Sequence, residues 1–148
     1  MVQVTNGSFI LGRKHAPEQL GSVLILGLGK SGKVAADYCV RLLGGRVGAL
    51  CIAGGAEGDD SRGFVESIAA RALADADAPR VCYRFGDEAV PALAAEVGGR
   101  FDLCIASPGI PYWADLYQDA LKVSDEVISE VEFAWRESAA DSRWVAIT

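Results

Sequence analysis

A glycine-rich segment at residues 27–32, with the sequence GLGKSG, has the G-x-G-x-x-G spacing of a phosphate-binding loop. In this pattern the first glycine permits a tight turn, the second lets the backbone approach a phosphate, and the third lets a helix pack closely on the preceding strand. The segment lies between an apolar run and an amphipathic one, so the N–H groups at the start of the predicted helix would face the anion. We therefore expect phosphate contacts from Gly27, Leu28, Gly29, Lys30, Ser31 and Gly32.

A nicotinamide dinucleotide site makes a further demand, which this sequence does not meet. Such sites place an Asp or Glu about 20 residues after the loop, where it binds the ribose hydroxyls. Residues 50–55 read LCIAGG, with no acid before Glu57 and no basic residue for a 2′-phosphate. We therefore keep an NAD(P)-dependent oxidoreductase or a regulatory dinucleotide-binding domain only as the alternative to another phosphate-containing ligand. A third possibility is an interaction module that binds no ligand.

A second candidate loop, Ser107, Pro108 and Gly109, follows the fourth predicted strand. In an open α/β sheet, ligands bind outside the carboxyl ends of the strands, so this loop would share an edge with the glycine loop. Ser107 could add a hydroxyl donor to a phosphate. Pro108 fixes φ and Gly109 allows an otherwise forbidden φ, so a rigid structural turn explains the same residues equally well.

No side chain of this sequence is predicted to act in catalysis or to bind a metal. Ser129 and Glu132 form a capping box at the start of a helix, and the helix dipole favours Glu130 beside them. His15 has no second histidine and no cysteine nearby, so it lacks partners for a metal site.

The cysteines and tryptophans are interpreted as structural residues. The cysteines form no C-x-x-C pair, and buried reduced thiols are expected rather than disulfides or zinc ligands: Cys39, Cys51, Cys82 and Cys104. None of the tryptophans adjoins the glycine loop in sequence, so packing is expected rather than stacking on a ligand: Trp113, Trp135 and Trp144.

Hydrophobic periodicity predicts strands and helices in alternation. Strands are expected at residues 22–27, 46–53, 80–85, 100–106, 126–128 and 143–148, and helices at 31–43, 64–73, 90–97, 113–121 and from 129 onward. Polar turn regions are expected between them, including residues 75–79. Such an alternation with short connections predicts an α/β fold, a Rossmann-like, doubly wound, mainly parallel sheet with helices on both faces.

The first predicted helix is amphipathic. Its apolar face is expected to be buried: Val34, Ala35, Tyr38, Cys39 and Leu42. The opposite face carries Lys33, Asp37 and Arg41 at i, i+4 spacing, and we interpret it as a solvated face rather than a binding patch.

Composition excludes several classes of partner. The chain has 148 residues, of which 51% are hydrophobic and 23% charged, and a net charge of −6. This balance provides no field to attract nucleic acid or an anionic bilayer. No apolar run approaches the ~20 residues of a membrane span, and residues 1–19 lack the features of a secretory signal, so a cytoplasmic location is expected.

Three motifs together resemble one known family. GLGKSG after an apolar strand, ASPGI at residues 106–110, and VISEVEFAW at residues 127–135 leading to WVAIT are similar to the N-terminal domain of the Mur ligases. The closest resemblance is to the MurD type, which adds D-glutamate to UDP-N-acetylmuramoyl-L-alanine. It covers about residues 22–148.

The resemblance implies a division of labour among domains. The N-terminal domain would hold the UDP moiety of UDP-N-acetylmuramoyl-L-alanine, with no cofactor of its own, while a central domain binds ATP and Mg²⁺ and the whole enzyme adds D-glutamate. In the family, the VAIT strand runs directly into the P-loop that holds ATP, and this chain stops one residue short of that loop. The chain alone is therefore expected to be catalytically inactive.

One departure from the family concerns the end of the second strand. Members often place there an Asp that bonds the uracil, and this sequence has no acid between Arg46 and Gly55. Either backbone groups of residues 53–55 substitute for it, or the side chain of Glu57 or Asp59 reaches round.

The expected domain organisation follows from these elements. Residues 1–21 form an N-terminal extension, residues 22–142 the UDP-binding domain, and residues 143–148 the first strand of a truncated ATP-binding domain. Without its natural neighbours, that last strand is expected to be poorly anchored.

Overall fold

The computed structural model describes residues 8–73 and 81–147. Its strands are β1 (Gly21–Leu26), β2 (Val47–Gly54), β3 (Val81–Phe85), β4 (Leu103–Ala106) and β5 (Val127–Ser129). Its helices are α1 (Lys30–Val40), α2 (Asp59–Leu73), α3 (Ala89–Glu96), α4 (Asp115–Val123) and α5 (Glu130–Glu137). Several predicted features lie outside the described residues. These are the two ends of the chain (residues 1–7 and Thr148), the polar turn at residues 75–79, and Arg80, the first residue of the third predicted strand.

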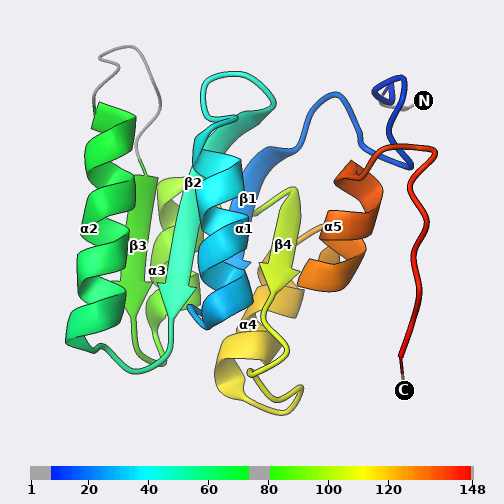
Figure 1. Ribbon diagram of the computed structural model, residues 1–148. Helices are drawn as coiled ribbons and strands as arrows, with labels where there is room; N and C mark the ends of the chain where they lie inside the picture. Colours follow the sequence, from blue (N-terminus) through cyan, green and yellow to red (C-terminus); the bar gives the residue numbers. More distant parts are fainter. Residues whose placement is uncertain (1–7, 74–80, 148) are drawn as a thin grey trace.

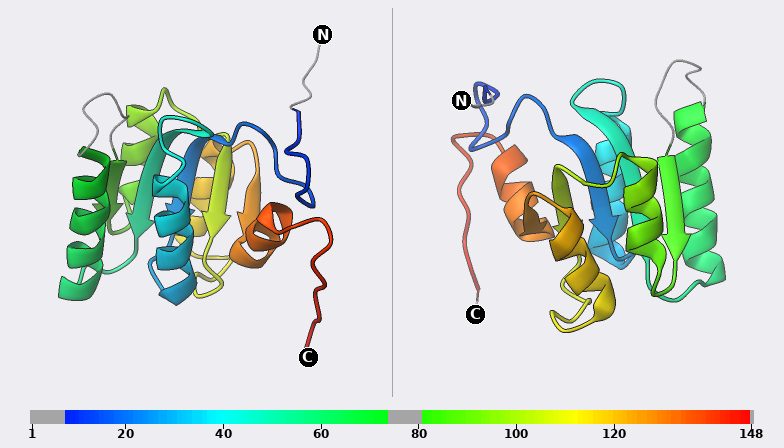
Figure 2. Two further views of the ribbon diagram at one scale, coloured as in Figure 1. Left: turned by 45° about the horizontal axis from the view of Figure 1, so that its top comes forward. Right: turned by 180° about the vertical axis from the view of Figure 1, so that it is seen from behind.

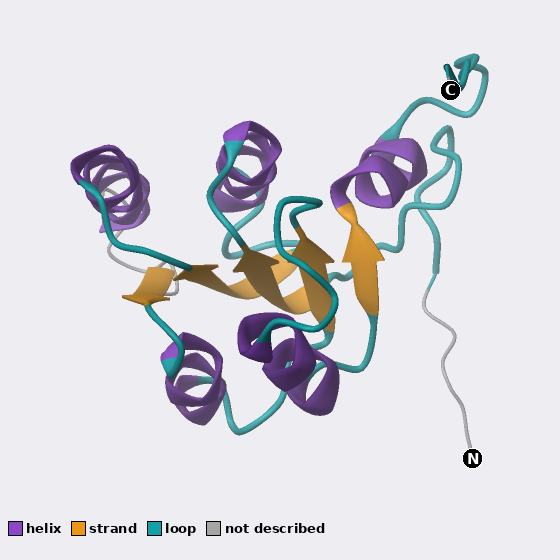
Figure 3. Cartoon of the chain, turned by 90° about the horizontal axis from the view of Figure 1, so that it is seen from below, coloured by secondary structure: helices purple, strands orange, loops and turns teal. Residues whose placement is uncertain are grey.

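The strands form one parallel sheet in the order β3-β2-β1-β4-β5 (Figure 1). Helices α1, α2 and α5 cover one face, and α3 and α4 cover the other, as the views from behind and from below show (Figures 2 and 3). The predicted doubly wound α/β sheet is confirmed. β1 lies at the centre, where Leu26 pairs in register with Ala53 of β2 and Ala106 of β4.

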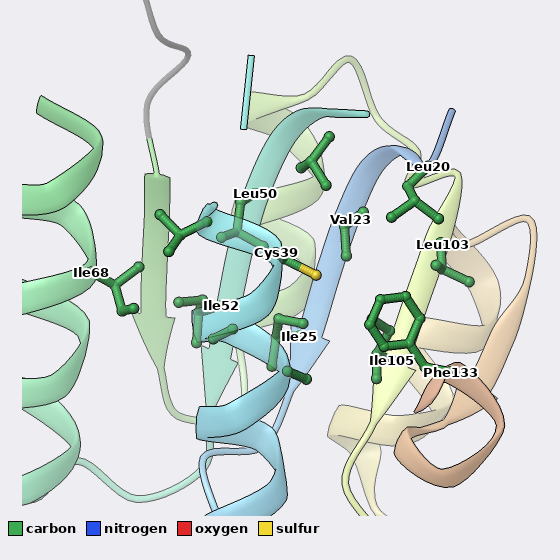
Figure 4. Close-up of a cluster of buried hydrophobic side chains, with 14 of the residues drawn as sticks. Leu20, Val23, Ile25, Cys39, Leu50, Ile52, Ile68, Leu103, Ile105 and Phe133 are labelled. Atoms are coloured by element: carbon green, nitrogen blue, oxygen red, sulfur yellow. The ribbon is translucent and has the colours of Figure 1, made fainter. Parts of the chain in front are cut away.

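The sheet separates two apolar layers because alternate residues of each strand point to opposite faces. Val23 and Ile25 of β1 pack in the layer of α1, α2 and α5, together with Phe133 of α5 (Figure 4). Leu24 and Leu26 pack in the layer of α3 and α4. All four of these β1 residues are fully buried, which explains why the central strand is a continuous apolar run.

Helix α1 differs from its prediction in its end and in its buried face. It ends at Val40 because the chain turns back to β2 through Gly44, whose φ is +90°. Val34 is 69% exposed, so its assignment to the buried face was wrong. The buried residues are Gly32, Ala35, Ala36, Cys39 and Val40.

The charged face of α1 is solvated, as expected, and is held by ion pairs to α2. Asp37 pairs with Arg41 at 3.0 Å and with Arg71 of α2 at 2.5 Å, and Lys33 lies 3.7 Å from Asp60. Hydrogen bonding to Arg71 lowers the pKa of Asp37.

Two other elements begin three or more residues away from their predicted starts, and the starts of the rest differ by one or two residues. Helix α2 begins at Asp59 rather than at residue 64, since two acids in its first turn favour the helix dipole and Ser61 bonds the preceding Gly58. β4 begins at Leu103 because the Asp102 carboxylate turns to accept a hydrogen bond from the Ser22 N–H at 2.8 Å.

Residues 8–20, part of the expected N-terminal extension, pack against the end of α5. Ala16 and Leu20 are buried. The backbone N–H groups of Lys14 and His15 donate to the carbonyls of Ser138 and Arg136 at 3.0 Å each. This segment therefore shares its packing with the sheet domain.

A buried ion pair anchors the end of α5 to the start of β2. Arg46 donates to both carboxylate oxygens of Glu137, at 2.6 and 2.8 Å, and the Tyr38 hydroxyl donates to the same carboxylate at 2.6 Å. Only 5% of the Glu137 side chain is exposed. Both carboxylate oxygens of Glu137 therefore have donors, as a buried charge requires. The Nε atom of Arg46 has no hydrogen-bond partner among the described residues.

The chain after α5 runs alongside that helix, away from the sheet (Figure 1). The strand expected at 143–148 is absent over the described residues 143–147. Val145 and Ile147 are 83% and 94% exposed. The Trp144 indole N–H donates to the Ser138 hydroxyl at 3.2 Å, which is a local contact.

The cysteines and tryptophans match their predictions only in part. All four cysteines are free thiols, as predicted, and Cys82 is only partly buried, whereas Cys39, Cys51 and Cys104 are buried. Burial raises the pKa of each of these three thiols to about 12. The assignment of the tryptophans as packing residues was wrong, since all three are exposed: Trp113 by 80%, Trp135 by 41% and Trp144 by 47%.

Among the helices that the structure describes, none has the length and apolar character of a membrane span.

Candidate functional site

The two predicted loops lie side by side at the carboxyl edge of the sheet. One follows β1 and the other follows β4, the strand next to it. The Ser107 N–H donates to the carbonyl of Leu26 at 2.8 Å, and the Gly27 N–H donates to the carbonyl of Ala53 at 2.8 Å. The ends of three strands therefore fix the positions of both loops.

Gly27 makes the tight turn that the pattern predicts. Its φ is +96°, in the region that favours glycine. A Cβ atom at this position would lie 2.7 Å from the Cβ of Ser107 and 2.9 Å from the Cδ1 of Ile110. Gly27 is thus required both by its backbone and by the close approach of the second loop.

Gly32 and Gly29 stand in contrasting surroundings. A Cβ atom at Gly32 would collide with the carbonyl oxygen of Gly27, so this glycine permits the close helix–strand packing expected of it. Gly29 has an extended backbone, with φ −69° and ψ −176°. The nearest atom to a Cβ there would be the Ser107 hydroxyl oxygen, at 3.7 Å. The protein's own packing does not require a glycine at this position.

The first turn of α1 can receive an anion. It contains no acidic residue, and Gly29, its N-cap, offers no side-chain hydrogen bond. Lys30 and Ser31 are exposed there, and Lys30 makes no ion pair with the residues that the structure describes. The helix N-terminus and the Lys30 ammonium therefore present positive charge to the solvent.

The second loop contributes one buried hydroxyl. Ser107 is 7% exposed, while Pro108 and Gly109 are exposed. The carbonyl of Ser107 accepts a hydrogen bond from the Ile110 N–H at 3.2 Å, which closes a turn. The φ of Gly109 is not in the left-handed region, so the turn does not use the conformation that a glycine allows there.

The carbonyl groups at the end of β2 already accept hydrogen bonds from neighbouring loops. The carbonyl of Ala53 accepts from Gly27, and the carbonyls of Gly54 and Gly55 both accept from the N–H of Gly86, at 3.2 and 2.8 Å. A Cβ atom at Gly54 would meet the ring of Phe85 at 2.6 Å, so packing explains this glycine.

Glu57 and Asp59 are the two acids that could replace the uracil-binding Asp, and each has a structural role in this fold. Glu57 pairs with Arg62 at 3.0 Å, and Asp59 lies in the first turn of α2. That backbone groups of residues 53–55, or the side chain of Glu57 or Asp59, replace the missing acid remains a prediction.

A groove of about 530 Å³ runs between α1 and α5 from the glycine loop. Its walls include Lys30 and Ser31 at the loop, Tyr38 and Phe133 further along, and Glu130 at the start of α5. Glu130 is 9% exposed, and its Oε1 atom has no hydrogen-bond partner among the residues that the structure describes.

Glu130 was predicted to be an acid that the helix dipole favours, and its burial was not predicted. The available signal was its position directly after β5, at the same sheet edge as both loops. The neighbouring cap is confirmed, since the Ser129 hydroxyl accepts from the Glu132 N–H at 3.1 Å. The Glu132 carboxylate does not complete the capping box and instead lies 3.4 Å from Arg136.

No group of three or more His, Cys, Asp or Glu side chains is placed to hold a metal ion within residues 8–73 and 81–147. The groups suited to a ligand at this edge are backbone N–H donors, the Ser107 hydroxyl and the Lys30 ammonium. Such donors bind an anionic group.

The chain is similar in sequence to several curated proteins. One from Exiguobacterium sibiricum is 35% identical over 128 residues, covering 85% of this chain and 23% of that protein. One from Streptococcus uberis is 36% identical and one from Streptococcus pyogenes 33%, each over 118 residues that cover 80% of this chain and 22% of the relative. All three are named "UDP-N-acetylmuramoylalanine--D-glutamate ligase". The chain thus spans less than a quarter of the length of these relatives.

Neither protein-family models nor solved structures give a further relative of this chain that informs its function. No protein-family model matches the chain. A solved structure of a universal stress protein in complex with cAMP has a TM-score of 0.42 and 19% identity, over 73% of this chain and 94% of that chain. This likeness is too low to inform either fold or function.

The sheet and its first loop define a Rossmann-like α/β domain, the class that places a glycine-rich turn between its first strand and first helix. Within this class, the chain is related to the N-terminal domain of Mur ligases of the MurD type. The predicted family resemblance is confirmed.

Proposed function

We propose that this chain holds the UDP moiety of UDP-N-acetylmuramoyl-L-alanine within a ligase of peptidoglycan biosynthesis. The glycine loop, residues 27–32, would bind the diphosphate, and residues 107–109 would approach it from the neighbouring strand. The names of the curated relatives supply the substrate, and the relation to their N-terminal part supports the assignment.

One observation carries this proposal. A Cβ atom at Gly29 would meet only the Ser107 hydroxyl oxygen, at an ordinary contact distance of 3.7 Å, and Gly29 is the N-cap of a helix whose own first turn contains no acidic residue. The packing of the protein does not explain this glycine, whereas close approach of a phosphate does.

The rest of the reaction belongs to a longer protein. We propose that the full-length enzyme binds ATP and Mg²⁺ outside these residues and uses them to join D-glutamate to the substrate in the cytoplasm. No residue of this chain is proposed to act in catalysis.

Calorimetric titration of the chain with UDP, NAD and ATP tests the proposal. UDP is expected to bind in preference to the other two. Its affinity should be weak, because only part of the ligand's contacts are available on this chain. Tighter binding of NAD than of UDP would favour the oxidoreductase alternative instead.

A further inference from the structure

Glu130 is a buried carboxylate that the packing of the protein does not satisfy. It is 9% exposed, and its Oε1 atom makes no hydrogen bond with any residue that the structure describes. A buried acceptor without a donor is costly, so such a group calls for an explanation. The other buried acid on this helix, Glu137, has Arg46 and Tyr38 as partners.

The position of Glu130 places it next to the candidate phosphate site. It follows β5 at the carboxyl edge of the sheet, one strand beyond the loop of Ser107. Its Oε1 atom would lie 3.5 Å from a Cβ atom built on Gly32, so it faces the first turn of α1. Glu130 also lines the α1–α5 groove, in which Lys30 and Ser31 form the end nearest the glycine loop.

The donor that Glu130 lacks is therefore to be sought in the groove. A phosphate cannot supply it, because a phosphate is an anion and carries acceptor oxygens. A sugar attached to the diphosphate carries hydroxyl groups, and an N-acetylated sugar also carries an amide N–H. Each of these groups donates well to a carboxylate.

We propose that Glu130 accepts a hydrogen bond from a hydroxyl or amide N–H group of the sugar joined to the bound diphosphate. This inference rests on the proposed function and adds a contact that distinguishes a nucleotide sugar from its nucleotide. The glycine loop would bind the diphosphate of both the nucleotide and the nucleotide sugar, whereas Glu130 would contact only the sugar.

Calorimetry on the 148-residue chain tests this role with two probes, UDP and UDP-N-acetylmuramoyl-L-alanine. Glu130→Gln keeps the shape of the side chain and removes its charge. It should weaken binding of the nucleotide sugar by about tenfold, the loss typical of a hydrogen bond to a charged group, and leave UDP binding within about twofold. Glu132→Gln is the matched control, because Glu132 lies two residues further along α5 and is exposed. It should change neither affinity.

A second measurement uses the unaltered chain and so does not depend on the variant's folding. The carboxyl carbon resonance of Glu130 should move when the nucleotide sugar is added and stay in place when UDP is added. An equal movement with both probes, or an E130Q variant that binds both as the unaltered chain does, would overturn the role. Tighter binding of UDP by E130Q would also overturn it, because the carboxylate would then be repelling the diphosphate. If the unaltered chain bound neither probe, the proposed function itself would fail.

Discussion

Gly29 and Gly32 are three residues apart, and the structure gives them different reasons to be glycine. Gly32 is needed for packing, since a Cβ atom there would collide with the Gly27 carbonyl. Gly29 is free of such contacts and has a backbone conformation that any residue adopts. Substitutions at the two positions should therefore separate folding from binding.

Gly29→Val should fold and lose affinity for UDP. The new side chain meets ordinary van der Waals contact with Ser107 and occupies the space through which a phosphate would reach the backbone. Circular dichroism should show a melting temperature close to that of the unaltered chain, and UDP titration should show no binding. A folded variant that binds UDP normally would place the diphosphate site elsewhere.

Gly32→Ala should lose stability first. The added methyl group forces α1 away from the end of β1, and overpacking of this kind costs about 1–3 kcal/mol. Urea denaturation should show a lower midpoint with an unchanged slope. An unaltered midpoint would mean that the loop can relax around the methyl group, contrary to the contact described above.

The buried pair of Arg46 and Glu137 should make the folding stability of the protein depend on pH. Burial alone would raise the pKa of Glu137, but hydrogen bonds from Arg46 and Tyr38 outweigh it and lower that pKa below its ordinary 4.5. A carboxyl group with a lowered folded-state pKa stabilises the protein above its unfolded pKa. It loses that contribution as the pH falls through the folded value.

Glu137→Gln should therefore be less stable at pH 7, by roughly 3 kcal/mol, because it leaves the buried Arg46 charge without its partner. The unaltered chain is expected to lose stability as the pH falls below 4.5, because the pKa of Glu137 is lowered, and the variant should lack that part of the decline. Urea denaturation across pH 3–7 measures both effects. Glu96→Gln, which breaks the exposed pair with Arg84, is the control and should change stability by less than about 1 kcal/mol. Equal losses in the two variants would contradict the account of the buried pair.

At the scale of the elements, the sequence predicts strands better than helix boundaries. β1 and β2 are apolar at nearly every position because both of their faces are buried, so their runs are unambiguous. The start of α2 was missed because its first turn is polar and exposed and carries no periodic signal. The orientation of α1 was misjudged at Val34, because the Gly–Ala face that packs on the sheet is less hydrophobic than its neighbour. Side-chain size, not hydrophobicity, decides that contact.

The apolar segment at residues 143–147 shows why a pattern alone does not make a strand. Its residues read as a buried strand, yet Val145 and Ile147 are exposed and pair with no strand among the described residues. β5 is the edge strand of the described sheet on this side, yet the segment runs alongside α5 instead of pairing with β5 (Figure 1). Whether an apolar segment pairs with a sheet edge depends on where the chain before it leads, which the sequence of the segment does not show.

Hydrogen exchange should distinguish this segment from the sheet. The amides of residues 145–147 are expected to exchange near the unprotected rate, whereas those of residues 24–26 exchange only on wider opening of the fold. Protection of both groups to a similar degree in a monomer would mean that the final segment belongs to this domain's own core. The predicted boundary at residue 143 would then be wrong.

At the scale of the whole molecule, the fold class and the meeting of the two loops at one edge could be predicted from the sequence. The alternation of elements fixes a parallel sheet, and a parallel sheet collects its loops at one edge. The loops of Gly27 and Ser107 meet there because β1 and β4 are neighbours, although 80 residues separate them in the chain. The groove and the burial of Glu130 could not be predicted, because they depend on how α5 packs against α1.

The central claim is that the loops after β1 and β4 form one diphosphate site. The most direct measurement is an NMR titration of the ¹⁵N-labelled chain with UDP. If the two loops bind the diphosphate, the largest amide shifts should lie at Gly29, Lys30, Ser31 and Gly32 and at Ser107 and Gly109. Shifts confined to other parts of the sheet, or no shifts with UDP where NAD produces them at these loops, would contradict the claim.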